Sequence, residues 1–140
     1  MSTILFADDN RNIREFCRRE LEDDGYGVVV AADGREALRL TGCLSPDVVI
    51  LDIVMPGMDG LTALAEIRAI EPNLPVILFT SFDDVCTRDK RSSYATACVE
   101  KREDLSELKR AVSAALRRRR NNQPYRLGLP PAAHGASRTG

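Results

Sequence analysis

Apolar and polar positions follow two patterns that alternate five times along this chain. Short continuous apolar runs are each followed by a longer segment in which apolar residues recur every three or four positions between charged ones. The first pattern is typical of buried strands and the second of amphipathic helices. We therefore predict strands at residues 2–7, 28–32, 47–52, 75–80 and 97–99, each followed by a helix.

The predicted helices differ in how clearly their ends are marked. Asn10 and Asp104 each precede a helical pattern and are suitable N-caps. The second helix is expected to stop near Gly42, and the third ends before Pro72, because proline cannot continue a helix. The fourth, at residues 83–94, is polar and only weakly periodic.

Regular alternation of strands and helices predicts the α/β class. Right-handed strand–helix–strand crossovers produce a parallel, doubly wound sheet with helices on both faces. A chain of 140 residues is long enough for one such domain, which we place at residues 1–119. The remainder, 120–140, is basic and contains proline and glycine, so we expect a disordered tail.

Bulk composition narrows the class of protein. Apolar residues make up 44% and charged residues 29%, as in soluble globular proteins. The chain has neither a membrane-length apolar run nor a recognisable secretory signal, so we expect it to be cytoplasmic. A zinc site is not expected, because the four cysteines form no CxxC pair and the single histidine is His134. We interpret Cys17, Cys43, Cys86 and Cys98 as reduced, mostly buried thiols.

Charge is distributed unevenly along the chain. From residue 117 onward there are six arginines and no acid, so the preceding part is acidic. The four arginines at 117–120 offer a surface for nucleic acid or for an acidic partner. The simpler interpretation is the solvated end of the last helix, where cations favour the helix dipole. We therefore do not expect binding to nucleic acid or to membranes.

Chemically active side chains gather at the predicted strand ends. Asp8 and Asp9 follow the first strand, Asp52 the third, Thr80 ends the fourth and Lys101 follows the fifth. Ligands of open parallel sheets bind outside the carboxyl ends of the strands. Three carboxylates meeting there repel one another and require a cation, for which Mg²⁺ fits the oxygen ligands.

Each of these residues also has a purely structural interpretation. An aspartate after a strand is often a helix cap or a turn former, a threonine is a good strand residue, and a lone lysine is usually solvated. Taken together, in this order and each at a strand end, they favour a functional cleft.

These residues carry a resemblance to a known family. Over residues 1–118 the chain resembles the receiver domain of two-component response regulators, with matching stretches at 6–10, 51–60, 79–81 and 99–101. The resemblance implies a flavodoxin-like (βα)5 fold with strand order 2-1-3-4-5. It also implies a phosphorylated signalling protein of the stand-alone, single-domain type, with no enzymatic activity beyond phosphorylation and slow dephosphorylation of itself.

The resemblance assigns a role to each residue of the cleft. Asp52 would accept a phosphoryl group from a histidine kinase or a histidine phosphotransfer protein, as in a phosphorelay. Asp8, Asp9, Asp52 and the backbone carbonyl of Val54 would hold Mg²⁺. Among the other two catalytic residues, Lys101 would bind a phosphoryl oxygen and the hydroxyl of Thr80 would bond to another.

The sequence departs from the family at three positions near Lys101. Arg102 stands where the family usually has a proline, and Cys98 stands where it usually has an aromatic residue whose rotation accompanies threonine movement. Tyr94 stands where the family commonly has a turn glycine. Its ring either substitutes for the missing aromatic residue or is a packing residue of the domain. We therefore expect phosphorylation itself to be intact, while the coupling of Thr80 to an aromatic residue at the usual position is missing.

Two further positions bear on the lifetime of the signal. Val54 and Phe82 lie two residues after Asp52 and Thr80, and neither can orient a hydrolytic water. We expect slow autodephosphorylation. The alternative is that both side chains simply cover the site.

Output is expected through protein–protein contact, including a homodimer, by the face of the fourth helix, fifth strand and fifth helix. Two alternatives compete with the signalling function. A pseudo-receiver would fold without being phosphorylated, which the complete cleft disfavours. A phosphatase of the haloacid-dehalogenase type would require a second aspartate at position 54, which is Val54.

Overall fold

The computed structural model describes residues 1–81, 86 and 88–121. The strands are β1 (Thr3–Ala7), β2 (Gly27–Ala31), β3 (Val48–Leu51), β4 (Val76–Thr80) and β5 (Ala97–Glu100). The helices are α1 (Arg11–Asp23), α2 (Gly34–Leu44), α3 (Gly60–Ile70), the 3₁₀ helix η1 (Lys90–Tyr94) and α5 (Ser106–Asn121). Most of the expected tail lies outside the described residues.

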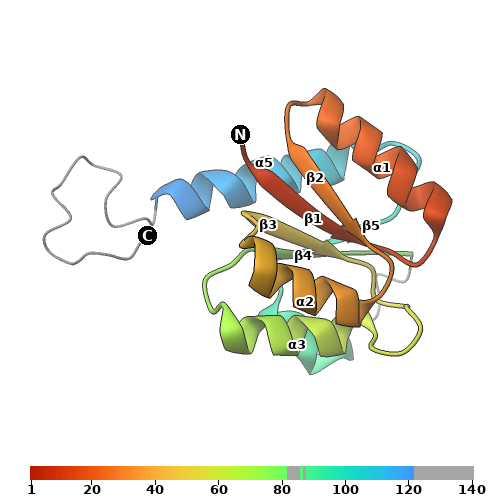
Figure 1. Cartoon of the computed structure of the whole chain (residues 1–140), viewed down its shortest axis with the longest axis vertical. Helices are drawn as coiled ribbons and strands as arrows, with labels where there is room; N and C mark the ends of the chain where they lie inside the picture. The colour runs from red at the N-terminus through yellow and green to blue at the C-terminus, as the bar shows by residue number, and fades with distance from the viewer. Residues whose placement is uncertain (82–85, 87, 122–140) are drawn as a thin grey trace, which may run out of the picture.

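All five strands form one parallel sheet in the order β2-β1-β3-β4-β5 (Figure 1). This confirms the predicted class and strand order. The register brings Ala7 beside Leu51, and Thr80 beside Glu100. Because all five strands are parallel, they end at one edge of the sheet, with β3 in the middle.

Two apolar clusters cover the two faces of the sheet. Alternate residues of β1 point to opposite faces: Ile4 and Phe6 join the cluster under α1 and α5, whereas Leu5 and Ala7 join the one under α2 and α3. Figure 1 shows the same layering, with α2 and α3 together below the sheet. β3 is buried along its whole length, as its continuous apolar run predicted.

Short polar side chains begin the helices. Asn10 accepts hydrogen bonds from two backbone N–H groups of α1, whereas Asp33 and Asp59 each accept one, at α2 and α3. Asp104 accepts from the N–H of Ser106 at the start of α5. The predicted caps at Asn10 and Asp104 are confirmed.

Two helices differ from the prediction. α2 continues past Gly42 to Leu44, because one glycine in a helix costs only about 1 kcal/mol, and it ends where Ser45 turns left-handed with φ 49°. The last part of the expected fourth helix is the 3₁₀ helix η1. There the hydroxyls of Ser92 and Ser93 donate to carbonyls three residues earlier and compete with α-helical bonding. Residues 83–85 and 87 of that prediction lie outside the described residues.

The interpretation of four reduced, mostly buried thiols is wrong for this structure. Cys86 and Cys98 form a disulfide, with Cα atoms 6.5 Å apart. Cys17 is a buried free thiol and Cys43 an exposed one. Cysteine spacing gave no sign of the pair, because β5 meets the segment around Cys86 only through tertiary folding. Within the described residues, no helix is long and apolar enough to cross a membrane.

Candidate functional site

Backbone hydrogen bonds at the strand ends position the site. The N–H of Asp52 donates to the carbonyl of Ala7 at 2.9 Å, which carries β3 one residue further along β1. In the same way the N–H of Asp8 donates to Ala31, and the N–H of Lys101 to Thr80. The sheet therefore holds Asp8, Asp52 and Lys101 on fixed backbone at one edge.

The three predicted carboxylates do meet. Asp8, Asp9 and Asp52 each present an oxygen within 4.8 Å of the others. Asp8 and Asp52 are buried, while Asp9 is exposed at the mouth. One oxygen of Asp8 accepts from the N–H of Asn10 at 2.9 Å, so the turn into α1 fixes the orientation of this carboxylate.

Lys101 joins the two buried carboxylates. Its Nζ lies 2.6 Å from Asp8 Oδ2 and 3.2 Å from Asp52 Oδ2, and 6.0 Å from the centre of the Phe79 ring. Burial alone would lower the pKa of Lys101. The hydrogen bond to Asp8 and the charge of Asp52 outweigh it, so the pKa is raised and the ammonium stays charged.

The negative charge of the Asp52 carboxylate is only partly compensated by this ion pair. Burial raises the pKa of Asp52, and the neighbouring charge of Asp8 raises it further. Lys101 and the N–H of Val54 act in the opposite direction but do not cancel the shift. The cleft therefore carries excess negative charge around Asp52, which a bound cation would relieve.

The residues present fit a magnesium ion. Asp8 Oδ2 is buried and lies 2.6 Å from the ammonium of Lys101, a contact that a bound metal ion would replace. The donor set is entirely carboxylate oxygen, which suits Mg²⁺ rather than a softer metal. Asp8, Asp9 and Asp52 form a cluster compatible with Mg²⁺ binding.

The other two predicted residues stand at opposite sides of Asp52. Thr80 is buried at the end of β4, next to the residue that precedes Lys101 in register. Val54 is 58% exposed, directly after the strand end. Phe82, its expected counterpart after Thr80, lies outside the described residues.

Three residues that matter to the site were not predicted. The guanidinium of Arg14 donates to the carbonyl of Asp8 at 2.9 Å and holds the acidic turn. Gly60 leaves no room for a Cβ, which would lie 1.9 Å from the carbonyl oxygen of Asp52. At Gly34 a Cβ would lie 2.3 Å from the carbonyl oxygen of Met58. From the sequence, both glycines suggest only a turn. Their close approach to distant segments could not be predicted, because such an approach leaves no local pattern.

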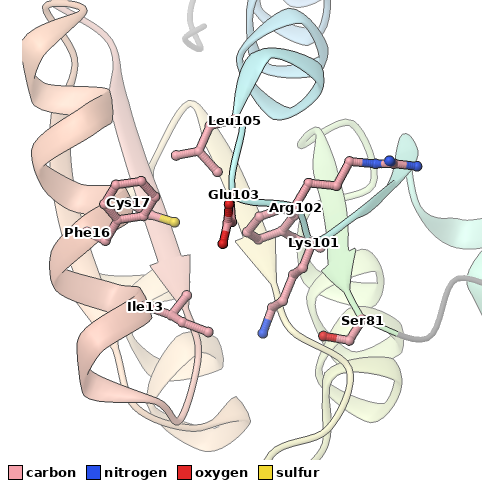
Figure 2. A pocket seen from close by; sticks show the side chains of 9 residues that line it. Ile13, Phe16, Cys17, Ser81, Lys101, Arg102, Glu103 and Leu105 are labelled. Atoms are coloured by element: carbon pink, nitrogen blue, oxygen red, sulfur yellow. The ribbon is translucent and has the colours of Figure 1, made fainter.

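A cavity of about 450 Å³ adjoins the site. Figure 2 shows it between α1, which contributes Ile13, Phe16 and Cys17, and the loop after β5. Lys101 lines the cavity as well, and Phe16 is 40% exposed. An apolar opening thus lies directly beside the ion-paired ammonium.

The three departures from the family cluster around β5. Arg102 forms an ion pair with Glu100 at 2.9 Å, and the backbone there is trans. Tyr94 is 53% exposed at the end of η1, which disfavours its interpretation as a packing residue. The Tyr94 carbonyl accepts two hydrogen bonds from Arg68 of α3. Cys98 is exposed on β5 and bonded to Cys86.

Comparison with known sequences gives a consistent result. The family model described as the response regulator receiver domain matches residues 4–113. The response regulator MprA of Mycolicibacterium vanbaalenii is 45% identical over 85 residues, which cover 61% of this chain and 37% of that protein. MprA of Mycobacterium avium is 41% identical over 85 residues, which again cover 61% of this chain and 37% of that protein. The chain thus spans well under half the length of these curated relatives.

Solved structures agree with the fold. The response regulator TrrA of Thermotoga maritima, solved in complex with Mg(2+)-BeF, superposes with a TM-score of 0.81 and 39% identity over 83% of this chain and all of that chain. TrrA in complex with the histidine kinase ThkA gives a TM-score of 0.78, over 83% of this chain and 99% of that one. Strand order, acidic cluster and family match together identify this chain as a member of the response regulator receiver domain family of two-component systems.

Proposed function

We propose that this chain accepts a phosphoryl group on Asp52 from a histidine kinase or a histidine phosphotransfer protein, with Mg²⁺ bound. The observation that carries this proposal is the setting of Asp52. Its buried carboxylate lies close to two further carboxylates and 3.2 Å from a charged ammonium. A nucleophile, a candidate metal site and a cation thus lie within a few ångströms of one another.

The chemistry suits this arrangement. Phosphoryl transfer breaks the bond from phosphorus to the histidine nitrogen and forms one to an Asp52 oxygen, giving an acyl phosphate. The protein contributes mainly positioning and charge compensation. Bound Mg²⁺, held by Asp8, Asp9, Asp52 and the carbonyl of Val54, would supply part of that compensation.

Lys101 supplies the rest of the positive charge. Its ammonium now pairs with Asp8 and Asp52. With Mg²⁺ held by the carboxylates and Asp52 phosphorylated, Lys101, which lies 3.2 Å from Asp52, would bind a phosphoryl oxygen. The hydroxyl of Thr80, buried at the end of β4, would bond to another and so report the modification to the segment after β4.

The partners follow from the same comparison. TrrA was solved in complex with the histidine kinase ThkA, and we infer a kinase of this kind as the phosphoryl donor. We expect output by protein–protein contact, including a homodimer through the face of the fourth helix, β5 and α5, in the cytoplasm. The receiver domain at 1–119 and the tail at 120–140 remain predictions, as does slow loss of the phosphoryl group beside apolar Val54.

Phosphorylation from a small donor tests the proposal. The purified chain is incubated with Mg²⁺ and acetyl phosphate, and intact-mass and peptide mass spectrometry locate the phosphoryl group. We expect it on Asp52, lost in Asp52→Asn and when Mg²⁺ is chelated. Asp23→Asn, an exposed residue at the end of α1, is the matched control and should label normally.

Two other functions predict different outcomes. A pseudo-receiver scaffold would stay unmodified by acetyl phosphate and would not bind beryllofluoride. A magnesium phosphatase would release phosphate catalytically from many donors, whereas a receiver retains one phosphoryl group per chain. Absence of label on Asp52, with the fold intact by circular dichroism, would refute the proposal and favour the scaffold.

A further inference from the structure

The Cys86–Cys98 disulfide joins two segments that flank the site. Cys98 lies in β5, three residues before Lys101, and pairs in register with Leu78. Cys86 belongs to the stretch between Thr80 and η1. The bond therefore ties the chain that leaves β4 to the strand that leads to Lys101, across a sequence separation of 12 residues.

On the β5 side, backbone hydrogen bonds connect this disulfide to the site. The N–H of Lys101 donates to the carbonyl of Thr80 at 2.9 Å, and Glu100 pairs with Thr80 in register. Between Cys98 and Lys101, β5 is held to β4 by its paired residues and by this backbone hydrogen bond. A force applied at Cys98 thus acts on the pair formed by Thr80 and Lys101.

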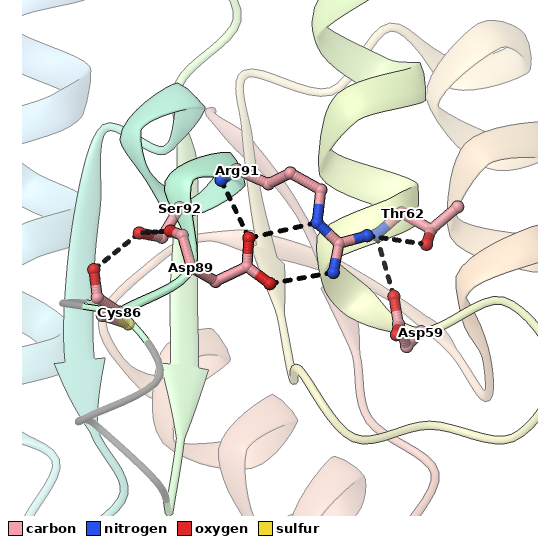
Figure 3. A network of polar contacts seen from close by, with 6 residues as sticks. All are labelled: Asp59, Thr62, Cys86, Asp89, Arg91 and Ser92. Atoms are coloured by element: carbon pink, nitrogen blue, oxygen red, sulfur yellow. Dashed lines mark hydrogen bonds and ion pairs between the residues drawn. The ribbon is translucent and has the colours of Figure 1, made fainter.

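The Cys86 side reaches the site by another route, which Figure 3 shows. The hydroxyl of Ser92 lies 2.6 Å from the carbonyl oxygen of Cys86 and 2.7 Å from that of Asp89. The carboxylate of Asp89 pairs with Arg91 at 2.9 Å. These contacts fix the position of Cys86 relative to the start of η1.

Arg91 extends the connection to the loop that follows Asp52. Its guanidinium donates to the hydroxyl of Thr62 at 3.3 Å, and the N–H of Thr62 donates to Asp59, the cap of α3 (Figure 3). The loop between β3 and α3 is closed at the same place, where the N–H of Gly60 donates to Ile53. Cys86 is therefore linked by successive contacts to the residue directly after Asp52.

We propose that Cys86 and Cys98 are a redox-regulated pair whose disulfide opposes the rearrangement that follows phosphorylation of Asp52. The consequence for Asp52 rests on the function proposed above, whereas the redox chemistry of the pair does not. In the oxidised form the bond adds a covalent restraint to the contacts around η1. In the reduced form only the hydrogen bonds and the Asp89–Arg91 ion pair remain.

The oxidant that the proposal requires is a small-molecule disulfide such as oxidised glutathione. One cysteine thiolate attacks it, forming a mixed disulfide and releasing one thiol. The second cysteine then displaces the remaining small thiol and closes the Cys86–Cys98 bond. Two protein thiols and one small disulfide thus become one protein disulfide and two small thiols.

Exposure together with a partner cysteine distinguishes this pair from the other two cysteines. Cys98 is exposed on β5 and Cys86 is partly exposed, so a small thiol can reach the bond. Cys17 is buried, and burial raises its pKa to about 12, so it has almost no thiolate. Cys43 is exposed but unpaired, and serves as an internal reference for thiol accessibility.

The first experiment tests the redox chemistry alone. The full chain is equilibrated in glutathione buffers of graded reduced-to-oxidised ratio, its free thiols are alkylated, and peptides are mapped by mass spectrometry. We expect one intramolecular Cys86–Cys98 link that converts reversibly to two thiols, with Cys43 taking up only mixed glutathione. A pair that remains free, or that forms only mixed or intermolecular disulfides, would overturn the proposal.

The second experiment tests the coupling to the site. Binding of beryllofluoride with Mg²⁺ is measured for the oxidised and the reduced chain. We expect binding to weaken about fivefold on oxidation, at the lower end of ordinary coupling between sites. Linkage requires the converse, so beryllofluoride should shift the thiol–disulfide equilibrium about fivefold toward the thiols.

Variants separate the possible outcomes. Cys86→Ser and Cys98→Ser should bind beryllofluoride like the reduced chain under both conditions, whereas Cys43→Ser should respond like the parent. Equal binding by the oxidised and reduced parent would overturn the coupling. If neither form binds beryllofluoride, the proposed function fails while the first experiment still decides the redox pair.

Discussion

The two halves of the sheet edge differ in what holds them. At the ends of β1 and β3, Asp8 and Asp52 are fixed by backbone hydrogen bonds within the sheet and by a tight contact at Gly60. At the ends of β4 and β5, the backbone hydrogen bond from Lys101 to Thr80 is joined by a disulfide and by surface ion pairs, and here the chain departs from its family at Cys98 and Arg102. The first half thus fixes the carboxylates of the cleft, whereas the second carries Thr80 and Lys101 together with the positions at which this chain differs from its family.

The largest expected effect breaks the first half. In Gly60→Ala the new methyl group would lie 1.9 Å from the Asp52 carbonyl oxygen, so the loop after β3 must move. We expect a loss of about 3 kcal/mol in the free energy of unfolding, measured by urea denaturation. Gly42→Ala is the control, because it has open space within a helix and should stabilise by about 0.5–1 kcal/mol. Equal stability of Gly60→Ala and the parent would contradict the close approach.

Removing the cation that joins the halves should be almost as severe. Lys101→Met keeps an unbranched chain but leaves Asp8 and Asp52 without their ammonium. We expect phosphorylation by acetyl phosphate to slow on the order of 100-fold, as for removal of one electrostatic contact in an active site. Lys109→Met, which loses only surface ion pairs with Glu20 and Asp24, should label at the parent rate. Similar rates for the two variants would exclude a catalytic role for Lys101.

The second half can be loosened without touching the first. Reduction of the disulfide should lower the free energy of unfolding by about 2 kcal/mol, within the usual range for a short closed loop. Cys98→Ser should show the lower stability under both conditions, in thermal melts with and without reductant. If the melting temperature of the parent protein is the same with and without reductant, the bond does not constrain the unfolded chain.

A change at Cys98, where the chain departs from its family, should affect output more than the rate of phosphorylation. Cys98→Tyr removes the disulfide and restores an aromatic side chain where the family usually has one. We expect altered affinity for the downstream partner with little change in the rate of phosphorylation. Cys98→Ser separates loss of the bond from gain of the ring. Equal partner binding by Cys98→Tyr and Cys98→Ser would exclude a role for the ring.

The smallest effect concerns the buried thiol beside the cavity. With a pKa raised to about 12 by burial, Cys17 is protonated at pH 8 and sheltered by α1 and the sheet. We expect iodoacetamide to modify Cys43 and to leave Cys17 unmodified until urea unfolds the chain. Rapid labelling of Cys17 in the native state, read by peptide mass spectrometry, would show that the cavity opens to its depth.

Much of the fold and site could be predicted from local patterns. Continuous apolar runs predicted the parallel strands, and the acids, threonine and lysine at their ends predicted the cleft, because parallel strands bring their carboxyl ends to one edge. The weakly periodic fourth helix was predicted less well. There serine hydroxyls compete for the backbone, and η1 forms in place of its last turns.

The sequence by itself determined the elements, their order and the residues that face one edge, since hydrophobic period and turn chemistry are local properties. The tertiary structure alone decided which distant atoms touch. It placed Asp8 Oδ2 2.6 Å from the ammonium of Lys101, left no space at Gly60 and joined Cys86 to Cys98. Such contacts depend on the packing of segments far apart in the chain, and spacing along the sequence does not encode them.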